Sequence, residues 1–139
     1  MNQIYPCLWF NTNAKDAAEY YCSIFEDGKI IQENPMVVIF EINKTKFMGL
    51  NGGPKFDFSP ATSFVIECET QEKIDYYWEK LGYEGSYQMC GWLTDKFGVS
   101  WQVVPSILPK LMEDPEKAPK VMESFLKMKK FDIETLIKA

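Results

Sequence analysis

The stretch "CGWLTDKFGVSWQVVP", residues 90–105, is the most informative part of the chain. Two apolar runs flank the turn-forming residues "DKFG" (95–98), which predicts a β-hairpin. Because side chains alternate along a strand, Gln102 shares one face with Ser100 and Val104, whereas Val99, Trp101 and Val103 point to the other face. The single uncharged polar side chain in the middle of this strand raises the question of what its face binds.

Length and charge place the chain among ordinary globular proteins. Its 139 residues are enough for one domain with a real hydrophobic core. The formal net charge of -5 argues against a nucleic acid or an anionic membrane surface as partner, because phosphate binding needs clustered cations. The sequence has no apolar run of about 18 residues and no signal-peptide pattern, so we expect a cytoplasmic protein with no membrane association.

Cysteine and histidine usage narrows the chemistry further. Cys7, Cys22, Cys68 and Cys90 occur singly, which favours reduced thiols over a disulfide framework or a zinc site. The chain contains no histidine, the commonest transition-metal ligand and the side chain best suited to proton transfer near neutral pH. This absence removes Ser-His-Asp and Cys-His catalysis and weakens every zinc, iron or nickel hypothesis.

The first half of the chain predicts one helix among four strands. The apolar run 5–10 is followed by Asn13 as a helix cap, and Gly28 ends the helical pattern. Residues 29–33, 36–42 and 46–50 have the composition of strands, with the last two joined by a turn at Asn43-Lys44. The Gly-Gly-Pro segment that follows predicts a loop over 51–60.

The pattern then repeats. Residues 61–69 predict a strand, and Thr70 and Gly82 bound a predicted helix that precedes a short strand (84–89) and the opening hairpin. "YYCSIF" (20–25) matches "YYWEKL" (76–81), and "FEINKTKFMGL" (40–50) resembles "WLTDKFGVSWQ" (92–102). The repeat predicts an α+β fold of two paired βαβββ modules, about 1–52 and 60–105, in a single domain 1–139.

Residues 106–139 form a different segment, rich in Met and Lys, that predicts C-terminal helices. "SILPKLM" (106–112) predicts a short helical turn, Asp114-Pro115 a helix start, and Asp132 the cap of a last helix. Two placements are open for this amphipathic tail: on its own domain, or over a partner subunit.

Pairing of the modules would turn the faces of the two sheets that carry no helix toward a cleft. Superimposing the tyrosine pairs places Cys7 opposite Ser63, and superimposing the hairpins places Leu50 opposite Gln102. Each position is defined to within one residue, so Pro6 and Asn51 are alternatives to Cys7 and Leu50.

Four segments carry a resemblance to a known family: "CLWFNTNAKDAAEYYCSIF", "FMGLNGGPKFDFSPATSFVIECE", "YYWEKLG" and the opening stretch. The chain resembles the PhnB-like branch of the vicinal oxygen chelate superfamily, which includes glyoxalase, bleomycin-resistance and dihydroxybiphenyl (extradiol) dioxygenase proteins. The sequence family of that branch is named 3-demethylubiquinone-9 3-methyltransferase. The resemblance implies paired βαβββ modules and commonly a homodimer.

The same resemblance implies where a metal would sit. In metal-using members of the superfamily, four inner positions carry His, Glu or Gln around a divalent ion. These positions fall here at Pro6 or Cys7, Leu50 or Asn51, Ser63 and Gln102. A thiol, a hydroxyl and amides suit neither a hard dication nor a borderline metal, so we expect no metal and no cofactor.

Other candidate site residues are less constrained. Lys55 stands where the branch usually has histidine ("NGGPHF"). Three roles are open for this lysine: it binds an anionic group, it acts as a desolvated base, or it remains solvated. Glu67 shares the strand parity of Ser63 and is the carboxylate candidate for acid–base work, or else faces solvent. Gln102 contacts a ligand or is a satisfied core amide, and Cys7 is a small buried hydrophobe or a nucleophile. Aromatic residues such as Trp9 and Phe56 are expected in the core, with one or two in a pocket wall.

Three functions remain open from the sequence. The first is a metal-free binding protein for a small, mostly apolar molecule, by analogy with bleomycin-resistance members. The second is an enzyme of the lyase, isomerase or dioxygenase type, in which Gln102, Ser63, Glu67 or Lys55 polarises a carbonyl-bearing substrate. The third, a methyltransferase, is least favoured, because the only Gly-Gly is followed by Pro and a loop rather than by a helix N-terminus.

Overall fold

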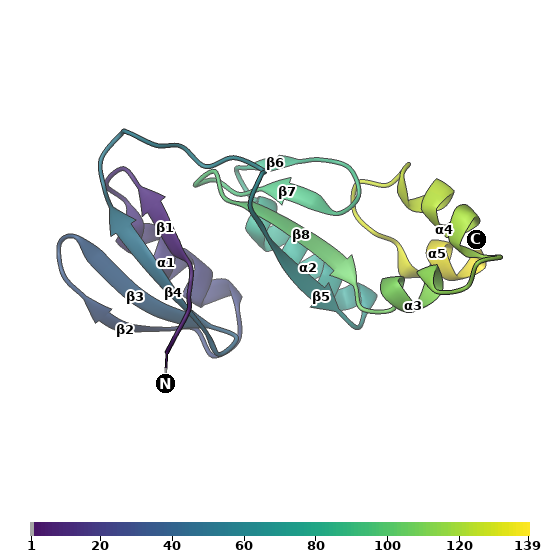
Figure 1. The fold of residues 1–139 in the computed structure, drawn as a ribbon, viewed down its shortest axis with the longest axis horizontal. Coiled ribbons are helices and arrows are strands. Elements are labelled where there is room, and N and C mark those ends of the chain that lie inside the picture. Colours follow the sequence, from purple (N-terminus) through teal and green to yellow (C-terminus); the bar gives the residue numbers. More distant parts are fainter. Residues whose placement is uncertain (1) are drawn as a thin grey trace. The chain divides into compact units, whose positions relative to one another are not determined.

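The computed structural model describes residues 2–139, which divide into two compact units, unit 1 up to residue 58 and unit 2 from 59 to 139. Unit 1 contains β1 (Cys7–Phe10), α1 (Ala14–Ile24), β2 (Lys29–Glu33), β3 (Val37–Ile42) and β4 (Thr45–Asn51). Its sheet has the order β1-β4-β3-β2, with β1 and β4 parallel and the other pairs antiparallel (Figure 1). The Asn43-Lys44 turn between β3 and β4 has positive φ at both residues, as a tight hairpin turn requires.

Unit 2 repeats this arrangement and adds the tail. It contains β5 (Ser63–Cys68), α2 (Gln71–Gly82), β6 (Ser86–Tyr87), β7 (Trp92–Thr94) and β8 (Ser100–Pro105), followed by α3 (Leu108–Met112), α4 (Ala118–Phe125) and α5 (Ile133–Lys138). The sheet order is β5-β8-β7-β6, again with only the first pair parallel. The predicted α+β fold of two βαβββ modules with C-terminal helices is confirmed.

The two sheets also share one register. In unit 1, Cys7 pairs with Met48 and Trp9 with Leu50. In unit 2, Ser63 pairs with Ser100 and Val65 with Gln102. Cys7 and Ser63 therefore stand at equivalent positions, as do Leu50 and Gln102, in agreement with both superpositions made from the sequence.

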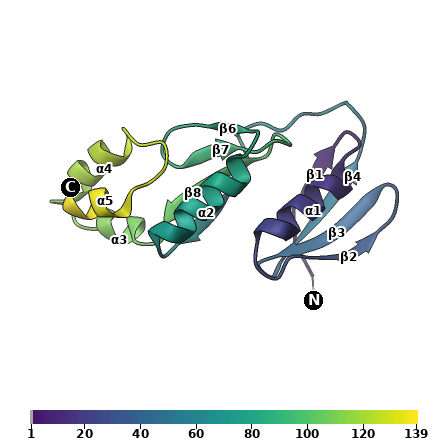
Figure 2. The same cartoon turned by 180° about the vertical axis from the view of Figure 1, so that it is seen from behind.

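Each sheet is covered by one helix on one face, as the two views of each unit show (Figures 1 and 2). In unit 1, Tyr21 of α1 is 1% exposed and stacks on Phe40 of β3, with ring centroids 6.1 Å apart. In unit 2, Trp101 and Val103 of β8 and Ile74 of α2 are buried. We call the opposite face of each sheet its open face.

The turn before β8 is held by a buried carboxylate. Asp95 is 3% exposed and accepts hydrogen bonds from the backbone N–H groups of Phe97 (2.8 Å) and Val99 (3.1 Å) and from Nε1 of Trp101 (2.9 Å). These bonds tie the turn to the strand that carries Gln102. The carboxylate thus defines the register of β8 from inside the unit.

Helix starts agree with the sequence at two positions and differ at two others. The side chain of Thr70 accepts a hydrogen bond from Lys73 N, and that of Asp132 from Thr135 N. Asn13 precedes α1 but makes no side-chain cap. The helix predicted after Asp114 begins only at Ala118, because the Asp114 side chain accepts a bond from Glu116 N and forms a turn first.

The tail packs on unit 2, which resolves the two placements left open by the sequence. The N–H groups of Cys90 and Gly91 donate to the carbonyls of Met128 and Lys129 (2.8 Å each). Gln71, at the start of α2, donates to Phe131 O and accepts from Ile133 N (2.9 Å each), and so binds the tail backbone with both ends of its amide. Residues 128–133 therefore form a strap against the unit.

Phe131 is the buried centre of this strap, at 2% exposure. Its ring packs beside Phe125 at 5.9 Å and against Gly91, where a Cβ atom would lie 2.6 Å from the ring. Lys130 adds an ion pair with Asp75 at 2.9 Å, and the Gln71 hydrogen bond together with Lys130 lowers the pKa of Asp75. The core of unit 2 is completed by a side chain from the tail.

Within residues 2–139, no helix combines the length and the apolar character that crossing a membrane requires.

Candidate functional site

The open face of unit 1 is formed mainly by uncharged side chains. Strand parity and register place six of them in two neighbouring rows: Cys7, Met48 and Ile39 in one, and Trp9, Leu50 and Val37 in the other. Cys7 is exposed, whereas Trp9 and Leu50 are half-buried. This part of the face offers apolar contact and one thiol.

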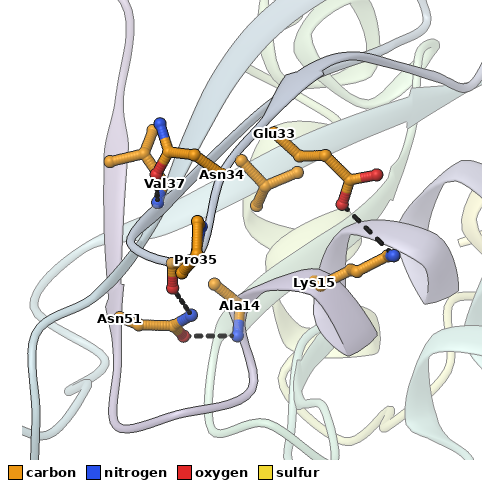
Figure 3. A pocket seen from close by; sticks show the side chains of 8 residues that line it. Ala14, Lys15, Glu33, Asn34, Pro35, Val37 and Asn51 are labelled. Atoms are coloured by element: carbon orange, nitrogen blue, oxygen red, sulfur yellow. Dashed lines mark hydrogen bonds and ion pairs between the residues drawn. The ribbon is translucent and has the colours of Figure 1, made fainter.

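Asn51, the alternative to Leu50, points to the opposite face and has a structural role. Its Oδ1 accepts a hydrogen bond from Ala14 N (2.9 Å) at the start of α1, and its Nδ2 donates to Pro35 O (3.1 Å) (Figure 3). Asn51 thereby caps the helix in place of Asn13 and ties it to the β2–β3 turn. Of the two candidates on β4, only Leu50 lies on the open face.

Asn51 also lines a cavity of about 340 Å³ between the start of α1 and the β2–β3 turn (Figure 3). At this cavity Lys15 and Glu33 form an ion pair at 3.3 Å. A second cavity, of about 520 Å³, lies between α4 and α5 and is lined by Lys120, Glu123, Ser124, Lys127, Met128, Thr135 and Ala139. Neither cavity is lined by Cys7, Leu50, Ser63 or Gln102.

The open face of unit 2 carries a polar pair. Nε2 of Gln102 donates a hydrogen bond of 3.0 Å to Oγ of Ser63, from the neighbouring strand. Both side chains are half-buried, and Val65, the ladder partner of Gln102, is 56% exposed. Glu67 lies on the same face and is exposed. Gln102 is thus positioned by the structure rather than free to rotate.

The thiol of Cys7 is not activated by its surroundings. Partial burial raises its pKa above the ordinary value, so less of it is thiolate at neutral pH. This environment suits an apolar contact better than a nucleophile.

Lys55 lies on a loop whose position is fixed by Trp9. The indole Nε1 of Trp9 donates to Gly53 O (2.9 Å), and Phe56 packs edge-on against the indole ring at 5.0 Å. The Lys55 ammonium lies 5.3 Å from the centre of the Phe56 ring. The sequence missed this cluster because its contacts join residues more than forty positions apart.

The predicted site residues therefore form two groups. Cys7 and Leu50 share the open face of unit 1, with Lys55 on the adjoining loop, and Ser63, Glu67 and Gln102 share the open face of unit 2. Asn51 leaves the first group. That both groups line one cleft stays a prediction from the sequence.

The donor atoms at the four equivalent positions do not fit a metal ion. Cys7 offers a thiol with a raised pKa, Leu50 no donor at all, Ser63 a hydroxyl, and Gln102 an amide. A hard dication needs charged oxygen ligands, and a borderline metal needs imidazoles or thiolates. In the part of the chain that the structure describes, no three His, Cys, Asp or Glu side chains group as a ligand set.

Two βαβββ modules of identical strand order, each with one helix on one sheet face, define the glyoxalase/bleomycin-resistance class of α+β fold. The chain belongs to the family described as 3-demethylubiquinone-9 3-methyltransferase, whose model matches residues 2–104. The resemblance noted in the sequence is confirmed. The strap and the helices α3–α5 lie beyond the matched residues.

Solved structures support this assignment. The PhnB protein from Bacillus cereus is 29% identical over 76% of this chain and 100% of its own, with a TM-score of 0.69. Two more distant structures share the fold. A glyoxalase-related enzyme from Fulvimarina pelagi is 9% identical over 76% of this chain and 89% of its own, with a TM-score of 0.53. The fosfomycin resistance protein FosX from Listeria monocytogenes, complexed with Mn(II) and sulfate, is 13% identical over 81% of this chain and 95% of its own, with a TM-score of 0.59. No curated protein matches the chain.

Proposed function

We propose that this PhnB-like protein is a metal-free binding protein for a small organic molecule, which contacts the open-face residues described above. The observation that carries the proposal is the Ser63–Gln102 pair, which occupies two of the four inner positions and is locked by its own hydrogen bond. The equivalent positions of the other sheet, Cys7 and Leu50, are neutral and apolar. Such a mixture of apolar area and few polar groups is typical of small-molecule sites.

The pair presents both donors and an acceptor to a ligand. Because one N–H of the Gln102 amide donates to Ser63, its second N–H, its carbonyl Oε1 and the hydroxyl proton of Ser63 remain for other partners. Among residues 2–139, none of these groups makes a further hydrogen bond. An amide or a hydroxyketone has the matching acceptor and donor.

Native mass spectrometry of the purified protein should detect a co-purifying small molecule. Replacing Gln102 by leucine should weaken the binding of that molecule by about tenfold, the cost of one lost hydrogen bond with its partner left unpaired. Isothermal titration calorimetry measures the change. Gln88→Leu is the matched control, because Gln88 is an exposed amide that bonds only locally to Ser86. Equal affinities of the Gln102 variant and the unmodified protein would remove the pair from the site.

The metal-free part of the proposal has its own test. Divalent Mn, Zn, Co and Ni ions should leave the melting temperature of the purified protein unchanged, and elemental analysis should find no stoichiometric metal. One tightly held metal per chain would overturn the proposal. It would favour the alternative, an enzyme acting on a carbonyl-bearing molecule with Glu67, on the face of Gln102, as the acid–base group.

The methyltransferase in the family's description gains no support from the fold. Gly52 and Gly53 follow β4, yet the next regular element is the strand β5 and not a helix. The carbonyl of Gly53 is bonded to Trp9, and a Cβ atom at Gly52 would clash with the same indole. This glycine pair shapes a loop over an aromatic ring and offers no helix N-terminus to a nucleotide-like cofactor.

We also propose a homodimer in the cytoplasm. Val65 on the open face of unit 2 and Met36 at the β2–β3 turn are 56% and 62% exposed, and such apolar side chains gain from a covering partner. All four cysteines are free thiols, which suits a reducing compartment. Light scattering at micromolar concentration should give twice the 16.2-kDa mass of the chain, and a monomer mass would contradict the dimer.

A further inference from the structure

Unit 1 contains an aromatic pair at the junction of β1 and the loop that follows β4. Trp9 of β1 and Phe56 of the following loop meet edge to face, with centroids 5.0 Å apart and an interplanar angle of 78°. The loop is anchored by the Trp9–Gly53 hydrogen bond. Phe56 nevertheless leaves 55% of its surface exposed. A large aromatic ring that is held in place and still exposed is suited to contact with another molecule.

The pair continues an apolar surface on the open face. Trp9 neighbours Leu50 across the β1–β4 ladder, and the adjacent row brings Met48 beside Cys7. We call Trp9, Leu50, Met48 and Phe56 the Trp9 platform. None of its members carries a charge, so it offers a flat or extended apolar molecule contact without a desolvation cost for ions.

Lys55 lies at the edge of the platform. Among residues 2–139, Lys55 forms no ion pair, and its ammonium lies 5.3 Å from the centre of the Phe56 ring. Lys46, also on this face, is different: it lies over the Tyr5 ring at 4.3 Å and donates to Gln3 at 3.2 Å. Lys55 is therefore the cation available to an anionic group at the platform.

We propose that the Trp9 platform binds the flat apolar part of an aromatic carboxylate and that Lys55 pairs with its carboxylate group. The inference rests on the proposed function, since it names the ligand class of that open face. The Lys55 ammonium is exposed, so it is a hydrated point charge whose attraction to a carboxylate is largest at low salt. The net negative charge of the protein does not oppose this pairing, because the charge close to the site determines the attraction of a bound anion.

Two probes that differ only in charge test the inference: 2-naphthoate and 2-naphthamide, titrated calorimetrically into the full chain at low salt. The unmodified protein should bind the carboxylate about tenfold more tightly than the amide. Lys55→Gln should reduce this preference to within about twofold. The control Lys46→Gln should keep the full preference, and Phe56→Ala should weaken both probes by a similar factor.

The outcomes separate this inference from the proposed function. Equal affinity for the two probes, or a preference that survives Lys55→Gln, overturns the inference and leaves small-molecule binding standing. Failure of both probes to bind overturns the inference and also counts against binding on this face. A third outcome would also overturn the inference: the unmodified protein shows no preference for the carboxylate probe, and the Lys55 variant no longer forms the dimer. Lys55 would then pair with a carboxylate of the partner subunit.

Discussion

Phe131→Ala should lower the free energy of unfolding by about 3–5 kcal/mol, the usual cost of removing a buried phenylalanine from a packed site. The ring is 2% exposed and belongs to the strap, which is bound by Gln71 and by the N–H groups of Cys90 and Gly91. A cavity at this place weakens the packing of the tail on unit 2 as well as the core itself. Urea unfolding followed by circular dichroism measures the loss.

Leu126→Ala is the matched control in the tail, because Leu126 is 55% exposed and its truncation should change stability by no more than about 0.5 kcal/mol. Gly91→Ala should reproduce much of the Phe131 effect. Its Cβ atom would lie 2.6 Å from the Phe131 ring and 2.5 Å from Val103 O, at a φ of +78° that suits glycine. Similar stabilities for Phe131→Ala and Leu126→Ala would contradict the packing described for the strap.

Asp95→Ala should cost roughly 3 kcal/mol or more of stability. The substitution leaves Nε1 of Trp101 and two backbone N–H groups without their acceptor in a buried turn, and each such donor costs about 1–3 kcal/mol. The indole of Trp101 should also report the change, as a red shift and broadening of fluorescence. Chemical unfolding and emission spectra provide the two measurements.

Asp114→Ala controls for the loss of a turn carboxylate. Asp114 likewise accepts a backbone hydrogen bond, from Glu116 N at 2.9 Å, but on the exposed surface, where water replaces the lost acceptor. Its cost should stay near 1 kcal/mol or below. If both aspartates proved equally dispensable, the buried carboxylate would not hold the β7–β8 turn.

The fold could be predicted from the sequence because the signals that define each helix, strand and turn are local. Alternating apolar runs, the turn residues at 43–44 and 95–98, and the cap at Thr70 each act within a few positions, and the structure has all of them. The equivalence of Cys7 with Ser63, and of Leu50 with Gln102, could also be predicted from the sequence, because the two sheets have the same register. Patterns of this range are visible in a single chain.

Contacts between distant positions were not predictable in the same way. The side chain of Asn51 caps α1, although Asn51 lies 37 positions after Ala14, whose N–H it binds. Asn13, which the sequence predicted as the cap, makes no such hydrogen bond. The two ends of the Gln71 amide reach Phe131 and Ile133, 60 and 62 positions away. A polar residue that binds backbone elsewhere in the fold has no local signature, so Asn51 resembled a ligand contact and Gln71 an ordinary helix residue.

The shared register of the two sheets has a consequence for how their open faces differ. Along the parallel strand pairs, residues on one open face have counterparts at the same ladder positions on the other. Ser63 and Gln102 supply hydrogen-bonding groups at two of these positions, whereas Cys7 and Leu50 supply a thiol and an alkyl group. The backbone framework is the same at both places, so the side chains alone make the two faces chemically different.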